Sequence, residues 1–254
     1  MPVVVVPASP PRPGLVGTAL VESSPLTEAE VAELHGAMLK DTVAAVDRAG
    51  ADLLVNVRSD DDLPDEHVTD TDAGAELRAA VATAVNDVSD VRFEPQVGSS
   101  RSAVVGNAVT HLLREEGATS VGVAVPTAPL VTRSTLDSAG MKQRSSAVVL
   151  GPGGDGRVYY AGFAEPVDFA EAFAPPALRT LTERAPATVD GDATDVDFLP
   201  RQQVVDTGAD LASLLTVLDA RVAAGRAVPE HTTTTVREFG LDVVAEDDSI
   251  ALRR

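Results

Sequence analysis

The sequence predicts an α/β protein built on a Rossmann-like, mainly parallel sheet with helices on both faces. As far as residue 150, short β-branched apolar runs alternate with segments of helical periodicity, which is typical of parallel strands joined by helices. The chain of 254 residues is long enough to bury a sizeable core. It shows no internal repeat and no linker long enough to divide it. We therefore expect a single domain over residues 1–254, with 226–254 as a C-terminal extension packed on it.

The predicted strands are short runs of the apolar residues that fill buried sheets. In chain order they span residues 3–6, 53–57, 91–94, 121–125 and 147–150, with a further extended run at 158–163 and a final strand at 241–245. Pro7 and Pro126 directly follow two of these runs and end them.

The predicted helices are marked by apolar residues at helical spacing and by capping residues at their ends. Thr27 and Glu30 form a capping box, and Gly50 ends the helix that they open. Thr207 caps a later helix that Gly225 ends. Further helices are expected at 77–85, from the serines of 99–102 to 116, after residue 132, at 175–184 and around 236–239.

Charge is the strongest compositional feature, with 39 acidic against 20 basic residues and a formal net charge of -19. Such a surface repels itself at low salt and is screened near molar ionic strength, where the Debye length falls to about 3 Å. We interpret it as the surface of a protein from a salt-accumulating halophile. Nucleic acid is not expected as a partner, because its phosphates need a basic patch that the sequence lacks.

A second acidic feature is the run that contains Asp190, Asp192, Asp195 and Asp197. Carboxylates at such spacing can indicate calcium, but the fixed glycine and terminal glutamate of a helix-flanked calcium loop are absent. We therefore interpret the run as solvated surface.

The sequence contains no cysteine, which excludes disulfides, thiolate metal sites and a cysteine nucleophile. No stretch approaches the ~20 apolar residues of a membrane span. The first residues lack the basic start and cleavage site of a signal peptide, so we expect a cytoplasmic protein. Nothing in the sequence indicates an oligomeric state.

Residues 147–163 form the stretch that most suggests a functional site. The strand at 147–150 runs into the Gly-Pro-Gly-Gly of 151–154, which must break it and place Asp155 at the carboxyl end of the strand. Open α/β sheets keep their ligands at that end. The sequence leaves open the alternative of a glycine-rich turn whose Asp155 bonds only its own backbone.

Two loops after predicted strands are candidate ligand loops. In nucleotide-handling α/β proteins the loop after the first strand commonly lines the ligand. Here Arg12 and the main-chain amides around Gly14 are its evident anion ligands, although a proline-stiffened surface loop explains the segment equally well. The second loop, QVGSSRS, contains Gln96 and Gly98. On the long helix between these loops, His35 is expected to be partly buried or solvated, since nothing nearby in sequence would orient it.

Several separated segments, taken in order, carry a resemblance to one family: VVVVPASPPRPGLVGTAL, QVGSSRSAVVGNAV, GATSVGVAVPTAPL, VVLGPGGDGRVYYAGF and VVDTGADLASLL. Together they resemble the nucleotide-diphospho-sugar transferase superfamily over residues 3 to about 220. The resemblance is closest to a glycosyltransferase-A-like group near the guanylyltransferases of phospholactate and of the molybdenum cofactor. It implies a nucleoside triphosphate or nucleotide sugar bound at the carboxyl ends of the strands.

The resemblance also implies a divalent cation, Mg²⁺ or Mn²⁺, held by carboxylates, because diphosphate is a poor leaving group until its charge is neutralised. Asp155 would be the catalytic carboxylate in contact with metal or acceptor, and Asp206 would share the metal with it. The residues that the resemblance places against the nucleotide are Pro7, Ser9, Arg12, Gly14, Gln96, Gly98 and Arg157.

Several charged positions of the family are changed in this chain. Gly17 and Ala19 replace its lysine and arginine after the first strand, and Ala124 replaces its aspartate in the central strand. These changes remove charges that act on a metal and its phosphates, while the glycines and prolines that shape the backbone remain. The pattern is expected where a fold is kept and its chemistry is lost or altered.

The sequence is therefore consistent with three functions. The leading hypothesis is glycosyl or nucleotidyl transfer from a nucleotide sugar or nucleoside triphosphate with a divalent metal. The alternative is a catalytically inactive nucleotide-binding or regulatory module on the same fold. A hydrolase of phosphorylated substrates is a third hypothesis, for which the sequence offers no nucleophile with a nearby base.

Overall fold

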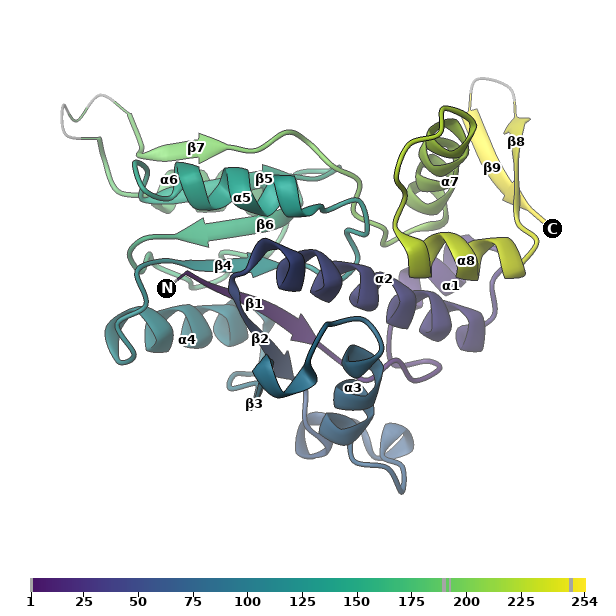
Figure 1. Cartoon of the computed structure of the whole chain (residues 1–254), viewed down its shortest axis with the longest axis horizontal. Helices are drawn as coiled ribbons and strands as arrows, with labels where there is room; N and C mark the ends of the chain where they lie inside the picture. The colour runs from purple at the N-terminus through teal and green to yellow at the C-terminus, as the bar shows by residue number, and fades with distance from the viewer. Residues whose placement is uncertain (1, 189–190, 192, 247–248) are drawn as a thin grey trace.

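The described residues form a seven-stranded sheet with the strand order β3-β2-β1-β4-β6-β5-β7 (Figure 1). The structure is a computed structural model that describes residues 2–188, 191, 193–246 and 249–254. The strands are β1 Val3–Ala8, β2 Asp52–Val57, β3 Arg92–Pro95, β4 Val121–Ala124, β5 Val148–Pro152, β6 Val158–Phe163 and β7 Val196–Phe198. Every strand is parallel to its neighbours except β6, which is antiparallel to β4 and β5. The prediction of an α/β fold with a mainly parallel sheet is confirmed.

Strand β6 is the main departure from the predicted sheet. It returns beside β5 as an antiparallel hairpin, joined to it by residues 153–157. At the centre of this turn Asp155 and Gly156 both have positive φ, 53° and 71°, and the Arg157 N–H donates to the Gly154 carbonyl at 2.9 Å. These are the features of a type I′ hairpin turn. The glycine-rich turn of the alternative is therefore present, but the Asp155 carboxylate pairs with Arg157 and not with its own backbone.

Helices cover both faces of the sheet, as predicted. Those on one face are α2 Glu28–Ala49, α3 Ala73–Ala82 and α5 Arg133–Lys142, and those on the other are α4 Arg101–Arg114 and α6 Ala177–Arg184 (Figure 1). Strand β1 shows the alternation that makes this possible, since Val4 and Val6 belong to one core cluster and Val3 and Val5 to the other. Short 3-10 helices lie in the connections: η1 Asp60–Asp62, η2 Asp65–His67 and η3 Val88–Asp90.

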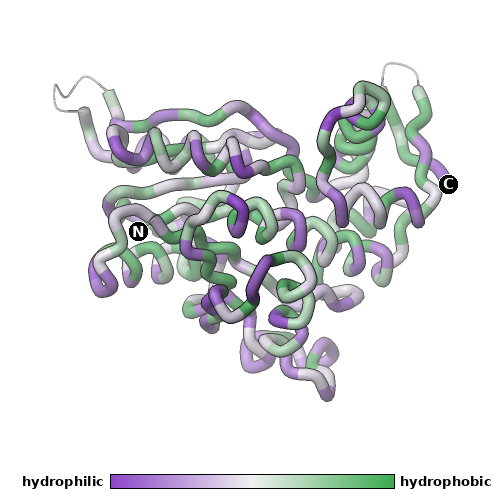
Figure 2. The backbone as a smooth tube through the Cα atoms, viewed as in Figure 1, coloured by the Kyte–Doolittle hydropathy of each residue, from purple (hydrophilic) through white to green (hydrophobic). Residues whose placement is uncertain are grey.

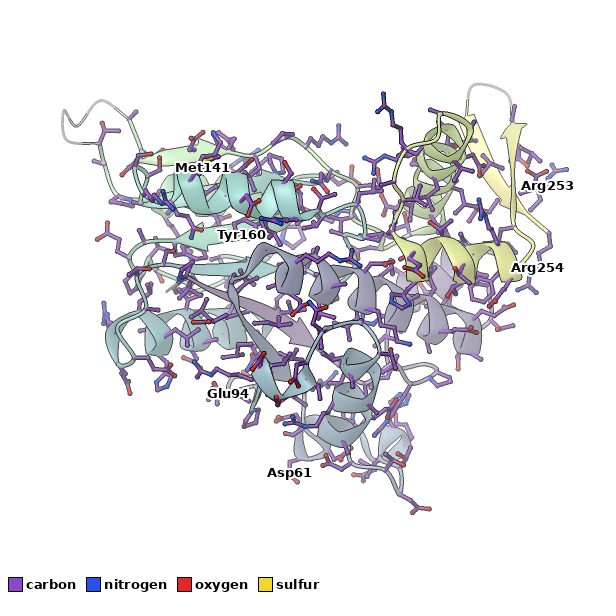
Figure 3. All side chains as sticks on the ribbon, in the orientation of Figure 1. Asp61, Glu94, Met141, Tyr160, Arg253 and Arg254 are labelled. Carbon is purple, nitrogen blue, oxygen red and sulfur yellow. The ribbon has the colours of Figure 1, made fainter. Side chains whose placement is uncertain are left out.

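Tyr160, labelled in Figure 3, fixes β6 against its neighbours. Its buried Oη donates to Oε1 of Gln143, the residue that caps the C-terminus of α5, at 3.0 Å. A Cβ on Gly122 of β4 would lie 2.2 Å from the same Oη. Position 122 must therefore be glycine for the ring to cross the adjacent strand.

A third apolar cluster joins the N-terminal half of α2 to the C-terminal part of the chain. It contains Leu34 and Met38 of α2 together with Leu211 and Val236. The elements around it are α1 Thr18–Ser23, α7 Gly208–Ala223, α8 Glu230–Glu238 and the hairpin of β8 Asp242–Glu246 and β9 Ser249–Arg253. Hydrophobic residues recur along the strands of the sheet and along α7 in Figure 2.

Helices α1 and α8 differ from the prediction. The sequence indicated no helix after the first loop, and it indicated only a short one at 236–239. Helix α8 begins earlier because Asp41 of α2 caps it from a distance. Its carboxylate accepts the N–H groups of His231 at 3.1 Å and Thr232 at 2.7 Å. A cap supplied by another helix leaves no local signal in the sequence.

The acidic run near residue 195 is only partly described, because Asp190 and Asp192 lie outside the described residues. Asp195 and Asp197 are not simply solvated. The Asp195 carboxylate accepts the N–H of Ala147 at 3.0 Å, and Asp197 pairs with Lys142 at 2.7 Å. The first interaction joins the residues that precede β5 and the unpredicted edge strand β7, and the second joins β7 to α5. Among the described helices, none combines the length and apolar character that crossing a membrane requires.

Candidate functional site

A cleft of about 510 Å³ opens where β1 and β4 end. Because these strands are parallel, their carboxyl ends meet at the same edge of the sheet, where open α/β folds bind ligands. Five residues expected from the sequence to contact nucleotide or metal line this cleft: Pro7, Ser9, Gln96, Gly98 and Asp206. Residues far apart in the chain therefore converge on one site.

The loop between β3 and α4 forms one wall of the cleft. The Gln96 side-chain amide donates to the Asn56 carbonyl at 2.9 Å, which ties the loop to the end of β2. Gly98 has φ of 136°, and a Cβ there would come within 2.9 Å of the main chain of Ala103 and Val104. Only glycine fits this position without strain. Ser100 then caps α4, whose N-terminus, with its partial positive charge, opens at the cleft.

Two arginines that the sequence analysis did not select also line the cleft. Arg101 is the first residue of α4, and its guanidinium lies 5.8 Å from the ring centroid of Phe173. Arg58 follows β2 and donates Nε and Nη2 to the Asp62 carbonyl at 3.1 and 2.8 Å. Within the described residues neither arginine forms an ion pair. A local signal existed for both, since each follows the carboxyl end of a predicted strand.

Enclosure within the cleft desolvates Arg101 and lowers the pKa of its guanidinium, against the attraction of Asp206. The side chain is nevertheless open to solvent, and an arginine keeps its charge at neutral pH. A charged guanidinium at the mouth of a cleft, without an ion-pair partner among the described residues, is a strong ligand for an anion.

Asp206 and His35 also line the cleft. Oδ1 of Asp206 accepts the Thr127 hydroxyl at 3.3 Å, and Oδ2 accepts Nη1 of Arg157 at 2.8 Å. His35 lies on α2, and within the described part of the chain its buried Nδ1 has no hydrogen-bond partner. Burial lowers the pKa of His35 to about 4, with the negative charge of Asp206 acting in the opposite direction. The imidazole is therefore neutral at neutral pH.

Arg12 and Gly14 lie outside this cleft, contrary to the sequence expectation. The guanidinium of Arg12 is 6% exposed and donates to Glu76 at 2.9 Å and to Asp60 at 3.0 Å. Its remaining bonds go to the carbonyls of His67 at 2.6 Å and Thr71 at 2.8 Å. A guanidinium so occupied cannot also serve as a phosphate ligand, and we do not retain Arg12 in the proposed site. Gly14 packs beside Glu28 and His67.

Asp155 and Arg157 form a separate ionic cluster behind Asp206. The Asp155 side chain is 89% exposed and is not among the residues that line the cleft. Arg157 donates to Asp155 at 3.2 Å, to Asp206 at 2.8 Å and to both oxygens of Asp210 at 2.9 and 3.0 Å. Its Nε donates to the Gly154 carbonyl at 3.1 Å. A guanidinium has five N–H groups, so Arg157 has none left for a phosphate.

The divalent metal site implied by the resemblance does not fit these residues. Among the described residues, no group of three or more His, Cys, Asp or Glu side chains could hold a metal ion. Ala124 ends β4 with no carboxylate, and the two retained carboxylates, Asp155 and Asp206, are bridged by Arg157. The cation that these acids contact is the guanidinium.

Solved structures of other proteins have the same fold as this chain. No protein-family model matches the chain, and the search of curated proteins found no significant match. A candidate nucleotide-diphospho-sugar transferase from Desulfovibrio desulfuricans G20 superimposes with a TM-score of 0.68 and 19% identity, covering 94% of this chain and 95% of that one. This similarity defines the architecture, and the chain has the nucleotide-diphospho-sugar transferase fold.

Two other solved structures are more distant. 4-Diphosphocytidyl-2C-methyl-D-erythritol synthase from Anaerococcus prevotii DSM 20548 has 12% identity and a TM-score of 0.48, covering 86% of this chain and 96% of that one. The Rv0371c protein of Mycobacterium tuberculosis H37Rv, in complex with manganese, has 19% identity and a TM-score of 0.41, covering 85% and 97%.

Proposed function

We propose that this protein binds a nucleotide or nucleotide sugar in the cleft between β1, β4 and α4. The observation that carries the proposal is the pair of guanidiniums of Arg58 and Arg101, without ion-pair partners among the described residues, at the carboxyl edge of the sheet. Two arginine forks beside a helix N-terminus suit a diphosphate, since each fork can make two charge-assisted hydrogen bonds. The fold and the sequence resemblance support a nucleotide as the bearer of that diphosphate.

In this proposal the arginines replace the phosphate ligands that the sequence has lost. Gly17 and Ala19 stand where the family has a lysine and an arginine, but Arg58 and Arg101 reach the cleft from β2 and α4. Positive charge is therefore present at the site although it comes from other elements. Gly98 and Gln96 would hold the loop that faces the phosphates.

Calorimetric titration with a panel of nucleoside triphosphates and nucleotide sugars tests the proposal. Hydrogen bonds to charged groups contribute about 1.5–3 kcal/mol, so Arg101→Ala and Arg58→Ala should each weaken binding about tenfold or more. Arg133→Ala is the matched control, because Arg133 lies on α5, is 67% exposed, and among the described residues pairs with Asp137 alone. If no compound of the panel binds, or if Arg101→Ala binds with wild-type affinity, the proposed nucleotide site is wrong.

A second candidate function is transfer of a glycosyl or nucleotidyl group at the same site. Asp206 favours it, since this carboxylate lines the cleft beside the neutral His35. An acceptor hydroxyl would attack the anomeric carbon or the α-phosphorus and pass its proton to the Asp206 carboxylate, while the bond to the departing phosphate oxygen would break. Arg58 and Arg101 would stabilise the negative charge that develops on the leaving group. The test is chromatography for released diphosphate or nucleoside diphosphate, which Asp206→Asn should abolish.

The cellular setting is also a proposal. A net charge of -19 favours a salt-rich cytoplasm, where counterions screen the repulsion between carboxylates. The free energy of unfolding should then rise steadily from low salt to molar KCl. A protein equally stable at both salt concentrations would argue against a halophilic origin of the acidic surface.

A further inference from the structure

We propose that Arg157 is a built-in cation that replaces the divalent metal of the transferase fold, so that the cleft binds nucleotide phosphate without metal. Its five N–H groups are divided among the Gly154 carbonyl and the carboxylates of Asp155, Asp206 and Asp210. The metal-independent binding of phosphate rests on the proposed nucleotide binding, whereas the replacement of the metal by Arg157 does not depend on it.

The position of the guanidinium carries the inference. Oδ2 of Asp206 lies 2.8 Å from Nη1 of Arg157, and Oδ2 of Asp210 lies 3.0 Å from the same nitrogen. Carboxylate oxygens are the protein ligands that Mg²⁺ and Mn²⁺ prefer, but here two of them bond a guanidinium nitrogen. Asp206 faces the cleft on its other side, so its charge is neutralised from behind.

The cluster is also fixed in place. Asp210 has a side chain only 10% exposed, and its carboxylate accepts the Thr207 N–H at 3.0 Å, the Thr207 hydroxyl at 2.9 Å and the Gln203 side-chain amide at 2.9 Å. The bond from the Thr207 N–H is part of the capping box that opens α7. Moving Arg157 aside for a metal would leave buried charge unpaired and would disturb the start of a helix.

The electrostatic consequence concerns Asp206. With a guanidinium behind it, this carboxylate repels an incoming phosphate less than a free aspartate would. The positive charge on the phosphate side is then supplied by Arg58 and Arg101. Neutralising Asp206 and attracting the phosphate both depend on arginines and not on a dissociable ion. EDTA should therefore leave nucleotide affinity unchanged.

The first arm of the test is Mn²⁺ binding alone, measured by electron paramagnetic resonance in molar KCl, where nonspecific attraction to the acidic surface is screened. Wild-type protein should show no saturable Mn²⁺ binding over the titrated range, and Arg157→Ala should bind one equivalent with a Kd at least tenfold below the highest concentration tested. Arg133→Ala removes the same charge from an exposed position and should behave like wild type. Stoichiometric Mn²⁺ on the wild type, or no gain in a folded Arg157→Ala, would overturn the inference.

Circular dichroism tests whether Arg157→Ala is folded. If it is not, stoichiometric Mn²⁺ on the wild type, or on Arg157→Lys, which keeps the charge, still overturns the inference. The second arm measures nucleotide affinity of the wild type in EDTA and in Mn²⁺. Equal affinities support metal-independent binding, and a tenfold increase with Mn²⁺ refutes it. If no nucleotide binds in either buffer, the proposed function fails, whereas the Mn²⁺ arm still tests Arg157 as the replacement cation.

Discussion

Replacing Arg12 with alanine would show whether this buried arginine supports the fold or binds phosphate. Its guanidinium donates to Asp60 and Glu76 and to the carbonyls of His67 and Thr71. It therefore connects the loop after β1 to the acidic segment of residues 60–76. We expect Arg12→Ala to destabilise the protein and to leave nucleotide affinity nearly unchanged.

The size of the effect follows from the burial of the partners. Removing one member of a fully buried ion pair costs about 3–5 kcal/mol. Asp60 and Glu76 are 24% and 28% exposed, so water can partly replace the lost guanidinium. We therefore expect a loss of about 2–3 kcal/mol, which for a chain of this size lowers Tm by roughly 5–10 °C.

The assay combines thermal unfolding in molar KCl with limited trypsin digestion. Arg12→Ala should unfold at lower temperature and be cleaved faster at Arg58 or Arg78, on either side of the segment that Arg12 holds. Arg133→Ala, which loses one exposed pair, should change stability by no more than about 0.5 kcal/mol. An unchanged Tm together with lost nucleotide affinity would refute the structural role and restore Arg12 as a phosphate ligand.

Three further predictions concern other parts of the fold. His35 has a pKa of about 4 in the folded chain, against its ordinary value of 6.5. The unfolded state therefore binds more protons, and the free energy of unfolding should fall by up to about 3 kcal/mol as the pH drops from 6.5 to 4. Urea titrations should show this slope weakened in His35→Gln, and an identical slope in both proteins would contradict it. Thr27→Ala removes the capping box of α2 and should cost about 1 kcal/mol in the same titrations, a value near zero being the contrary result. A chain ending at Gly225 should expose the apolar cluster around Val236 and bind a hydrophobic dye, unless 226–254 contributes nothing to the core.

Capping residues and apolar runs in the local sequence were sufficient to predict α2 and the strands β1, β2 and β4. Thr27, Glu30 and Gly50 mark both ends of α2, and the structure contains the predicted capping box and a left-handed cap at Gly50. Apolar runs found β1, β2 and β4 for the same reason. The direction of β6 could have been inferred as well, because Asp155-Gly156 is a strong type I′ hairpin signal.

Features that depend on distant partners could not be predicted. Helix α8 starts where Asp41, far away in sequence, caps it. Arg12 carried every local sign of an anion ligand, but the fold surrounds it with Asp60 and Glu76. The number of basic residues near a ligand loop says little until the structure shows which of them are already paired.

The same reasoning limits what position-by-position comparison can say about this cleft. Gly17, Ala19 and Ala124 each remove a charged side chain from the family pattern, and taken singly each indicates a lost function. Phosphate, however, responds to the summed charge around it and not to the strand that supplies it. Arg58 and Arg101 add two positive charges to the cleft, whereas Asp62 and Asp206 add two negative ones. Arg157 neutralises Asp206 from outside the cleft, so positive charge is left in excess. A cleft without a metal site can therefore remain attractive to a diphosphate.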